Sequence, residues 1–326
     1  MTRFPLGVLP TPLVRADRLR DARGGGPLWF KRDDLTGFGV AGNKVRALEH
    51  LLGDARARGV DVLVTGGGPD SNFVAAAAQA ARVAELDCEL VVWGDVGETT
   101  NLALARNAGA RIHPLGSDDR ARVDAEVERL GAELARRGRR PLAVPRGGST
   151  PVGATGFAAA AHEVVEQWSD APPTVVIPVG SGGSVAGLLA GLAGTGWPVL
   201  GASVSRPPEE ITAKVLALAG ETAALAGTAP PSGEQLTMLD ARGPGFGVAS
   251  PADRAAADLV LRTEGVLLDD TYGAKAAAVA MEHVGADPTR PTLLWLTGGL
   301  VSALSHVSEV RGYSPEFRSR TPEGAP

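Results

Sequence analysis

The sequence predicts an α/β protein with two lobes, built on parallel or mixed sheets with flanking helices. Short apolar runs alternate with alanine-rich helical stretches, which is the order typical of a parallel sheet covered by helices. The apolar runs are continuous, as expected for strands that are buried on both faces. With 326 residues, 44% of them hydrophobic, the chain is long enough to form two lobes rather than one.

The clearest elements are those with a short apolar run or a helical spacing of apolar residues. In chain order they are a strand at 60–67, a helix at 71–86, a strand at 88–94, a helix at 101–109, a strand at 174–180, a helix at 185–194, and strands at 198–204 and 292–299. The tail at 319–326 is predicted to be disordered.

Composition excludes several classes of function. The net charge is −5, the pI is about 5.6, and the basic residues form no sustained block, so nucleic acid and anionic membranes are not expected partners. No apolar run is long enough to cross a membrane, and the first residues lack the apolar core of a signal peptide. The single cysteine, Cys88, excludes an internal disulfide and is consistent with a cytoplasmic protein. The five histidines show no metal-ligand spacing with it.

Three expected strands end in turns of small residues, TGGGPDSN (65–72), GSGGS (180–184) and TGG (297–299). Ligands of open parallel sheets bind beyond the carboxyl ends of the strands. GSGGS leads directly into a helix, whose free N–H groups and dipole favour an anion. It is therefore a candidate phosphate site, with a tight strand–helix turn as the alternative. It matches neither the Walker loop nor the dinucleotide pattern GxGxxG.

Lysine is rare in this chain, and one lysine follows a glycine-rich loop. There are four lysines (Lys31, Lys44, Lys214 and Lys275) among 32 basic residues, which leaves 32 − 4 = 28 arginines. A lysine that is kept where arginine is the rule suggests a task that needs a deprotonated amine. Lys44 stands at the start of a predicted helix, whose dipole should lower its pKa. Together with a phosphate site, it predicts a Schiff base to an aldehyde cofactor, and pyridoxal phosphate (PLP) fits.

Two of the other three lysines, Lys275 and Lys31, have surroundings that do not indicate a catalytic role. Lys275 lies on the helix after Tyr272 without a glycine loop before it, so we interpret it as a surface or supporting residue. Lys31 lies in WFKRDD, at a strand end with alternating charges, and we expect it to be in a salt bridge.

At these residues the sequence resembles the D-cysteine desulfhydrase/1-aminocyclopropane-1-carboxylate (ACC) deaminase family. The resemblance begins in KRDDLTGFGVAGNKVRALEHLL (31–52) and continues through TGGGPDSN, VPRGGSTPVGATGF, VGSGGSVAGLLAGL, EGVLLDDTYGAKA and LWLTGG. These blocks span roughly residues 10–305 in the family's order, which is more specific than any one of them. The family consists of fold-type II PLP enzymes, related to the tryptophan synthase β chain.

The resemblance implies a role for each matching position. Lys44 would form the Schiff base and act as acid and base at the substrate Cα. Asn72 would bond the phenolic oxygen of PLP, and Thr297 would face its ring nitrogen. Ser71, with the backbone of 71–73, would hold the substrate carboxylate, and Tyr272 would be an active-site tyrosine. The phosphate would be bound by Gly180, Ser181, Gly182, Gly183 and Ser184.

Several positions near the substrate depart from the family's pattern. The family usually has histidine or glutamine where this chain has Phe73, and a second active-site tyrosine where it has Phe246. In deaminases a glutamate follows the tyrosine, whereas Gly273 follows Tyr272 here, which argues against ACC deaminase. Further departures are Asp70, Ala75 and Ala76. The predicted substrate pocket, made of Ser71, Asn72, Phe73, Phe246 and Tyr272, is therefore more apolar than in the family.

The resulting hypothesis is a PLP-dependent lyase that eliminates or deaminates a small amino acid, as D-cysteine desulfhydrase does, and gives a keto acid and ammonia. Alternatives are a relative with a specialised substrate (another lyase, a β-replacement enzyme or a racemase), a PLP-binding protein without activity, and a sugar- or nucleotide-phosphate binder. The resemblance further implies a homodimer, and a smaller lobe at 47–158 inserted into a larger PLP-binding lobe made of 1–46 and 159–326.

Overall fold

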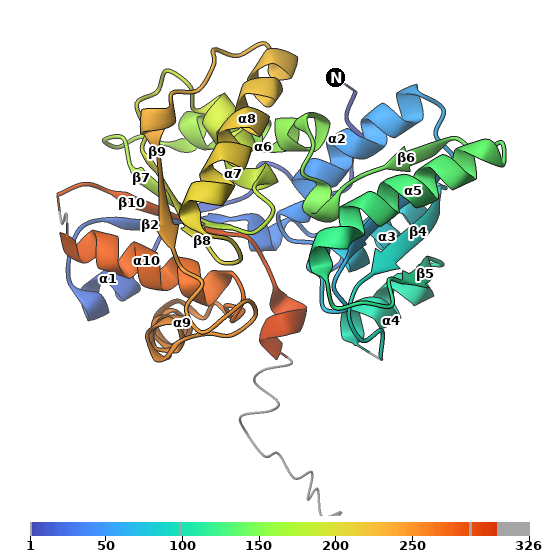
Figure 1. Ribbon diagram of the computed structural model, residues 1–326. Coiled ribbons are helices and arrows are strands. Elements are labelled where there is room, and N and C mark those ends of the chain that lie inside the picture. The colour runs from blue at the N-terminus through green and yellow to red at the C-terminus, as the bar shows by residue number, and fades with distance from the viewer. Residues whose placement is uncertain (1, 98, 287–288, 305–326) are drawn as a thin grey trace, which may run out of the picture.

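The computed structural model describes residues 2–97, 99–286 and 289–304, and within them the chain forms two sheets with helices on both faces (Figure 1). The larger sheet has the strand order β1-β2-β10-β7-β8-β9, and β1 is its antiparallel strand. The smaller sheet has the order β5-β4-β3-β6 and is parallel throughout. The predicted α/β fold with parallel and mixed sheets is therefore confirmed. The predicted disordered tail, 319–326, lies outside the described residues.

The elements have the following bounds. The strands are β1 Leu13–Arg15, β2 Leu28–Arg32, β3 Val62–Gly67, β4 Asp87–Val92, β5 Arg111–Pro114, β6 Pro141–Ala143, β7 Thr174–Val179, β8 Val199–Ser203, β9 Leu236–Asp240 and β10 Thr292–Leu296. The α-helices are α1 Asp17–Arg23, α2 Lys44–Ala57, α3 Asn72–Val83, α4 Thr100–Asn107, α5 Val123–Arg136, α6 Pro151–Gln167, α7 Gly183–Gly191, α8 Pro208–Ala226, α9 Pro251–Glu264 and α10 Gly273–Ala286. Short 3₁₀ turns are η1 Asp33–Leu35, η2 Arg120–Arg122, η3 Arg146–Gly148 and η4 Gly233–Gln235.

Each predicted strand and helix is present, with ends that differ by no more than three residues. The strands that the sequence did not reveal, β1, β5, β6 and β9, are the four edges of the two sheets. They are short and carry exposed or half-buried residues, because an edge strand is covered less completely than a central one. They therefore lack the continuous apolar run that marks a central strand.

The central strand β10 is buried on both faces, as its apolar run predicts. Leu293 and Trp295 point into the core that contains α2, α6, α7 and α8. Leu294 and Leu296 point into a second core with residues of α1, α9 and α10. Since successive side chains of a strand alternate between faces, an uninterrupted apolar run is what a doubly covered strand requires.

The strands of the smaller sheet all lie between residues 62 and 143, inside the segment predicted as an inserted lobe. The predicted boundaries, 46/47 and 158/159, lie inside helices α2 and α6. The division into lobes at these residues remains a prediction. None of the described helices combines the length and apolar character needed to cross a membrane.

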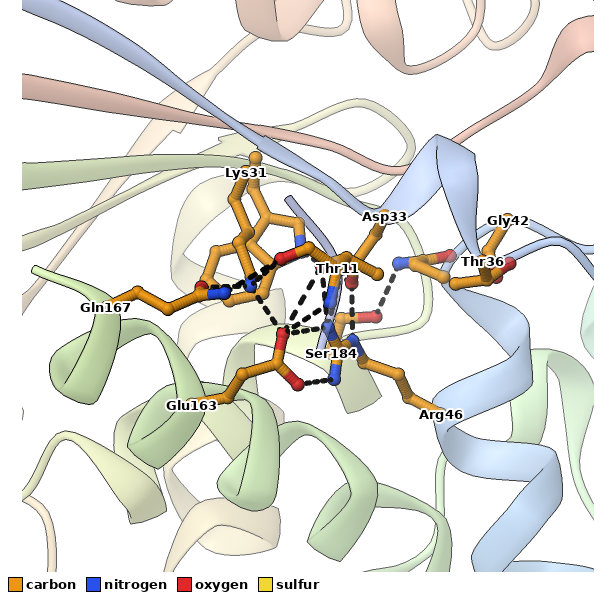
Figure 2. Close-up of polar contacts among 11 residues, drawn as sticks. Thr11, Lys31, Asp33, Thr36, Gly42, Arg46, Glu163, Gln167 and Ser184 are labelled. Atoms are coloured by element: carbon orange, nitrogen blue, oxygen red, sulfur yellow. Dashed lines mark hydrogen bonds and ion pairs between the residues drawn. The ribbon is translucent and has the colours of Figure 1, made fainter. Parts of the chain in front are cut away.

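A cluster of charged side chains is buried where β2, η1, α2 and α6 meet (Figure 2). Arg46 of α2 bonds both oxygens of Asp33, at 2.7 Å each. It also donates to the two carboxylate oxygens of Glu163 at 2.9 and 3.1 Å. Lys31 forms an ion pair with Glu163, as the sequence predicted, and donates to Gln167 at 2.6 Å. The two cations and two carboxylates balance, so no net charge is buried.

Ion pairing favours the charged forms of Arg46 and Glu163 in this cluster. Burial disfavours the charge on Arg46, but its ion pairs with Asp33 and Glu163 outweigh burial and raise its pKa. Burial likewise disfavours the Glu163 carboxylate, and the hydrogen bonds from Arg46 and Lys31 outweigh it and lower its pKa. Trp295 of β10 donates to Asp33 at 2.8 Å. The cluster therefore ties the start of α2 to the central strand of the larger sheet.

We expect Arg46→Met to lower the free energy of unfolding by about 3–5 kcal/mol, because it leaves the buried Asp33 without its partner. The matched control is Arg58→Met, just after the same helix, where an exposed arginine pairs with Asp54 at 2.9 Å. Such surface pairs contribute about 1 kcal/mol or less. Denaturant unfolding measures both variants, and equal losses would contradict the assigned role of the cluster.

Candidate active site

A cavity of about 890 Å³ opens beyond the carboxyl ends of β3, β7 and β10. The turns that follow these strands are the three small-residue turns singled out in the sequence. The predicted site residues that line it are Lys44, Ser71, Asn72, Phe73, Gly180, Ser181, Gly182, Ser184, Phe246, Tyr272 and Thr297. Gly183 lies beneath the turn, where an added Cβ would be 2.8 Å from Oγ of Ser149. The structure thus gathers residues from 44 to 297 around one cavity.

Lys44 is placed by a close contact between two loops. The preceding Gly42 has φ +55°, and an added Cβ would clash with the carbonyl oxygen of Thr297. The N–H of Asn43 donates to that same oxygen at 3.0 Å. Only glycine combines this backbone conformation with such an approach. The loop after β10 and the start of α2 are therefore locked together, with Lys44 and Thr297 on the same cavity wall.

The amine of Lys44 is unusually ready to lose its proton. Burial lowers its pKa from 10.5 to about 8, against the opposing effect of the Asp269 carboxylate. The sequence predicted this direction, although it attributed the shift to the helix dipole rather than to burial. A lysine with a pKa near 8 has a sizeable neutral fraction at physiological pH, as a nucleophilic amine needs.

The buried Asp269 lines the cavity, and sequence reasoning assigned it no role. Its carboxylate accepts the N–H groups of Thr271, Tyr272 and Gly273 at 3.2, 3.0 and 2.9 Å. Burial raises its pKa to about 6, even though these hydrogen bonds favour the charged form. Asp269 therefore fixes the loop that carries Tyr272 and places a negative charge near Lys44. An aspartate just before a predicted helix start could have indicated this capping.

Tyr272 keeps its phenolic proton over the physiological range. Burial and the charge of Asp269 raise its pKa to about 12, while Arg120 acts in the opposite sense. The ring packs against the GSGGS turn, since a Cβ added at Gly180 would lie 3.1 Å from Cε1 of Tyr272. Tyr272 is thus a hydrogen-bond donor held between the turn and the cavity.

The GSGGS turn has the geometry of an anion cradle. Gly182 is the N-cap of α7 with φ +98°, a conformation that glycine adopts without strain. The first N–H groups of a helix have no partner within it and point along its positive end. The hydroxyl of Ser149, on the loop before α6, donates to Oγ of Ser181 at 2.6 Å. Ser149 is a further hydroxyl at this turn that sequence reasoning did not single out.

Ser71 and Asn72 open helix α3 at the opposite wall. Oγ of Ser71 caps the helix by accepting the N–H of Val74 at 3.4 Å. Oδ1 of Asn72 accepts a hydrogen bond from Nδ2 of Asn101 at 3.3 Å, and Asn72 lines the cavity. Asn101 is buried on α4, and nothing in its sequence context indicated this contact.

The two phenylalanines that depart from the family differ in their surroundings. Phe73 is buried, and its ring lies against Gly148, where a Cβ would be 3.0 Å away. Phe246 is 41% exposed and meets Tyr272 edge to face, with the ring centroids 6.1 Å apart. Its loop is held by Lys275, which donates to the carbonyls of Arg242 and Gly245 at 2.5 and 3.2 Å. Lys275 is therefore a buried supporting residue, not a surface one.

These residues fit PLP. The cofactor needs an amine for its aldehyde, an anion site for its phosphate and polar contacts for its ring. Lys44, the start of α7 and the pair Asn72 and Thr297 offer these in one cavity. Among the described residues, no group of three His, Cys, Asp or Glu side chains is arranged to hold a metal ion.

Known proteins with similar sequences and structures point the same way. A family model described as pyridoxal-phosphate dependent enzyme matches residues 5–298. The D-cysteine desulfhydrase of Salmonella typhi is 34% identical over 318 residues, which cover 92% of this chain and 95% of that protein. A crystal structure titled as an ACC deaminase homologue matches with a TM-score of 0.88 at 30% identity, and covers 95% of each chain.

A more distant structure shares the fold alone. The fungal L-serine ammonia-lyase of Rhizomucor miehei matches with a TM-score of 0.66 at 20% identity, over 94% of this chain and 99% of that one. The family match over residues 5–298 and the 34% identity to a full-length relative establish that this chain belongs to the family of pyridoxal-phosphate-dependent enzymes.

Proposed function

We propose that this enzyme is a lyase that acts on a small amino acid in the manner of D-cysteine desulfhydrase. The Cα proton is removed, the substituent X leaves Cβ with the bonding electron pair, and the resulting enamine takes up water. The products are the keto acid anion, ammonium and HX, which is X⁻ plus a proton where X⁻ is a weak base such as chloride. The observation that carries the proposal is the position of Lys44, a lysine with a lowered pKa in one cavity with the GSGGS turn and Tyr272.

Bound PLP supplies the covalent attachment for the substrate amine and the electron sink for the Cα carbanion. Lys44 is the residue that we assign to the attachment and then to the Cα proton. A group that takes up and returns a proton works best with a pKa near the operating pH, and burial brings Lys44 to about 8. Ser71, with the N–H groups that open α3, would hold the substrate carboxylate.

Tyr272 is assigned to the leaving group. With a pKa of about 12 its hydroxyl is protonated and able to donate to X as the bond to Cβ breaks. Phe246, at the family's second tyrosine position, has no hydroxyl, so we assign the donation of a proton to the leaving group to Tyr272 alone. Gly273 offers no side chain where deaminases are expected to have a glutamate, which favours elimination over the opening of a cyclopropane ring. The predicted homodimer and cytoplasmic location are part of the proposal.

We expect the purified protein, given PLP, to develop a visible absorbance band that is absent in Lys44→Ala. The band reports the covalent attachment and needs no substrate. The matched control is Lys275→Ala, which removes another buried lysine but should keep the band. A wild-type protein without a band at saturating PLP would refute the assignment. With the band established, D-cysteine and ACC are screened for keto acid, and D-cysteine also for sulfide.

The rate of this attachment should rise with pH through about 8 and then level off. Only the neutral amine attacks the aldehyde, and a lowered pKa means that Lys44 loses its proton at a lower pH than an ordinary lysine with a pKa of 10.5. Stopped-flow absorbance of the apoenzyme mixed with PLP measures this profile. N-acetyl-lysine methyl amide serves as the reference, and a midpoint shared with that compound would contradict a buried, perturbed Lys44.

Tyr272→Phe should keep the absorbance band and lower kcat for D-cysteine by about 10²–10⁴-fold, the usual contribution of general acid catalysis. The loss should be smaller for β-chloro-D-alanine, because chloride leaves without a proton. Steady-state assays of keto acid with both substrates measure the difference. An equal loss for the two would show that the hydroxyl does not assist the leaving group.

A further inference from the structure

Among the described residues, the half-buried Arg120 lines the cavity without an ion pair, and neither the proposed mechanism nor the family resemblance uses it. Five cationic residues line the cavity: Lys44, Arg120, Arg146, Arg206 and Lys214. Arg146 is bound bidentately by Asp124 at 2.9 and 3.0 Å, and Arg206 pairs with Glu210 at 3.1 Å. Lys214 is exposed on α8, where burial and the neighbouring Arg206 lower its pKa against the opposing effect of Asp124 and Glu210. Arg120 differs from Lys214 because contacts with its neighbours fix its guanidinium at the cavity.

Arg120 is held by neutral groups in the part of the chain that the structure describes. Its guanidinium lies over the ring of Phe246, 5.2 Å from the centroid. One Nη2–H donates to the carbonyl oxygen of Ser205 at 3.2 Å. A guanidinium carries five N–H donors, so most of them remain for another partner. The contact with the ring fixes the plane of the guanidinium without neutralising its charge.

Arg120 lies near the position assigned to the leaving group. Phe246 links it to Tyr272, because the same ring contacts both the guanidinium and the tyrosine ring. The charge of Arg120 also acts on the Tyr272 hydroxyl and favours its ionised form. Arg120 comes from the turn before α5, whereas Ser205, Phe246 and Tyr272 belong to the half of the molecule with the larger sheet. It therefore reaches across the cavity from the opposite wall.

We propose that Arg120 determines substrate specificity by binding a negatively charged group on the Cβ side of the substrate. The substrate class is then a small amino acid whose β-substituent is an oxyanion that can leave with the bonding electron pair, such as a sulfonate, sulfate or phosphate. The planar fork of arginine matches two oxygens of these groups. This inference rests on the proposed function, since it names the substrate class of the same site.

The carboxylates that share the cavity leave this role open to Arg120. Asp124 and Glu210 are paired with arginines, and Asp269 is buried and bound by three N–H groups. Asp70 is exposed, beside Ser71 at the start of α3, which is the wall assigned to the substrate carboxylate rather than to its side chain. An anionic substituent near Tyr272 and Phe246 thus meets the guanidinium of Arg120, while the nearby Asp269 carboxylate is occupied by three N–H groups.

The test compares two substrates that undergo the same elimination and give the same keto acid. Serine O-sulfate carries an anionic substituent and β-chloroalanine a neutral one, and each is assayed in both configurations. We expect wild type to have the higher kcat/KM for serine O-sulfate. In Arg120→Gln the ratio of the two kcat/KM values should fall by about 10- to 100-fold, the range for a hydrogen bond to a charged group. Arg120→Lys, which keeps the charge but not the fork, should lie between.

The matched control is Arg122→Gln, an exposed arginine of the same 3₁₀ turn that does not line the cavity. Its ratio should equal that of wild type. An equal loss on both substrates in Arg120→Gln would overturn the proposal and make Arg120 a contact between the two halves of the molecule. So would a wild-type enzyme without preference for the anionic substrate.

Failure of the proposed function would look different. In that case PLP gives a band, but neither substrate yields keto acid. The dissociation constants of serine O-sulfate and β-chloroalanine are then measured by the change in cofactor absorbance. The ratio of these two constants, compared between wild type and Arg120→Gln, tests the role of Arg120. The absence of any cofactor band overturns both proposals.

Discussion

The ion-pair cluster around Arg46 and Asp33 is the interaction on which the site depends. Arg46 lies two residues after Lys44, and its guanidinium is bound to carboxylates from η1 and α6. Trp295, two residues before Thr297, donates to the same Asp33. The start of α2 and the end of β10 are therefore fixed by one carboxylate, and their loops meet again at the Asn43–Thr297 hydrogen bond. A buried cluster of this kind contributes little net stability, but breaking it is costly, so it holds Lys44 in one place.

The chemistry of the cavity follows from two effects that act on the pKa values of neighbouring groups, burial and the charges of their neighbours. Burial favours the neutral forms of Lys44, Asp269 and Tyr272. The charges of Lys44 and Asp269 stabilise each other, which limits the shift of the lysine and leaves its pKa near neutrality. Three N–H groups hold the Asp269 carboxylate in place. An amine that can release its proton thus lies in the same cavity as a hydroxyl that retains its own, a combination suited to removing one proton and donating another.

The residues assigned to the cofactor are easier to predict from local sequence than the residues that support the rest of the cavity. Lys44, GSGGS and Thr297 stand in short motifs whose backbone conformation requires particular residues, such as glycine at φ +98° for Gly182. A motif of that kind can be recognised from the sequence alone. Ser149, Asn101 and Arg120 act through contacts with residues 29 to 126 positions away (Arg120 with Phe246, for example), and ordinary serine, asparagine and arginine in loops and helices give no such signal. Lys275 shows the same limit, since the lack of a glycine loop before it indicated a surface or supporting residue, and only the fold shows that its side chain is buried.

The sequence by itself determined the α/β fold, the central strands and the lysine and glycine turns of the cofactor site. It could do so because central strands need continuous apolar runs and tight turns need glycine. The tertiary structure decided the edge strands, whose half-exposed residues carry no distinctive pattern. It also decided that burial, rather than the helix dipole, lowers the pKa of Lys44, and which arginine faces the cavity without a carboxylate. Burial and pairing depend on distances between residues that are remote in the chain, and only the folded arrangement sets those distances.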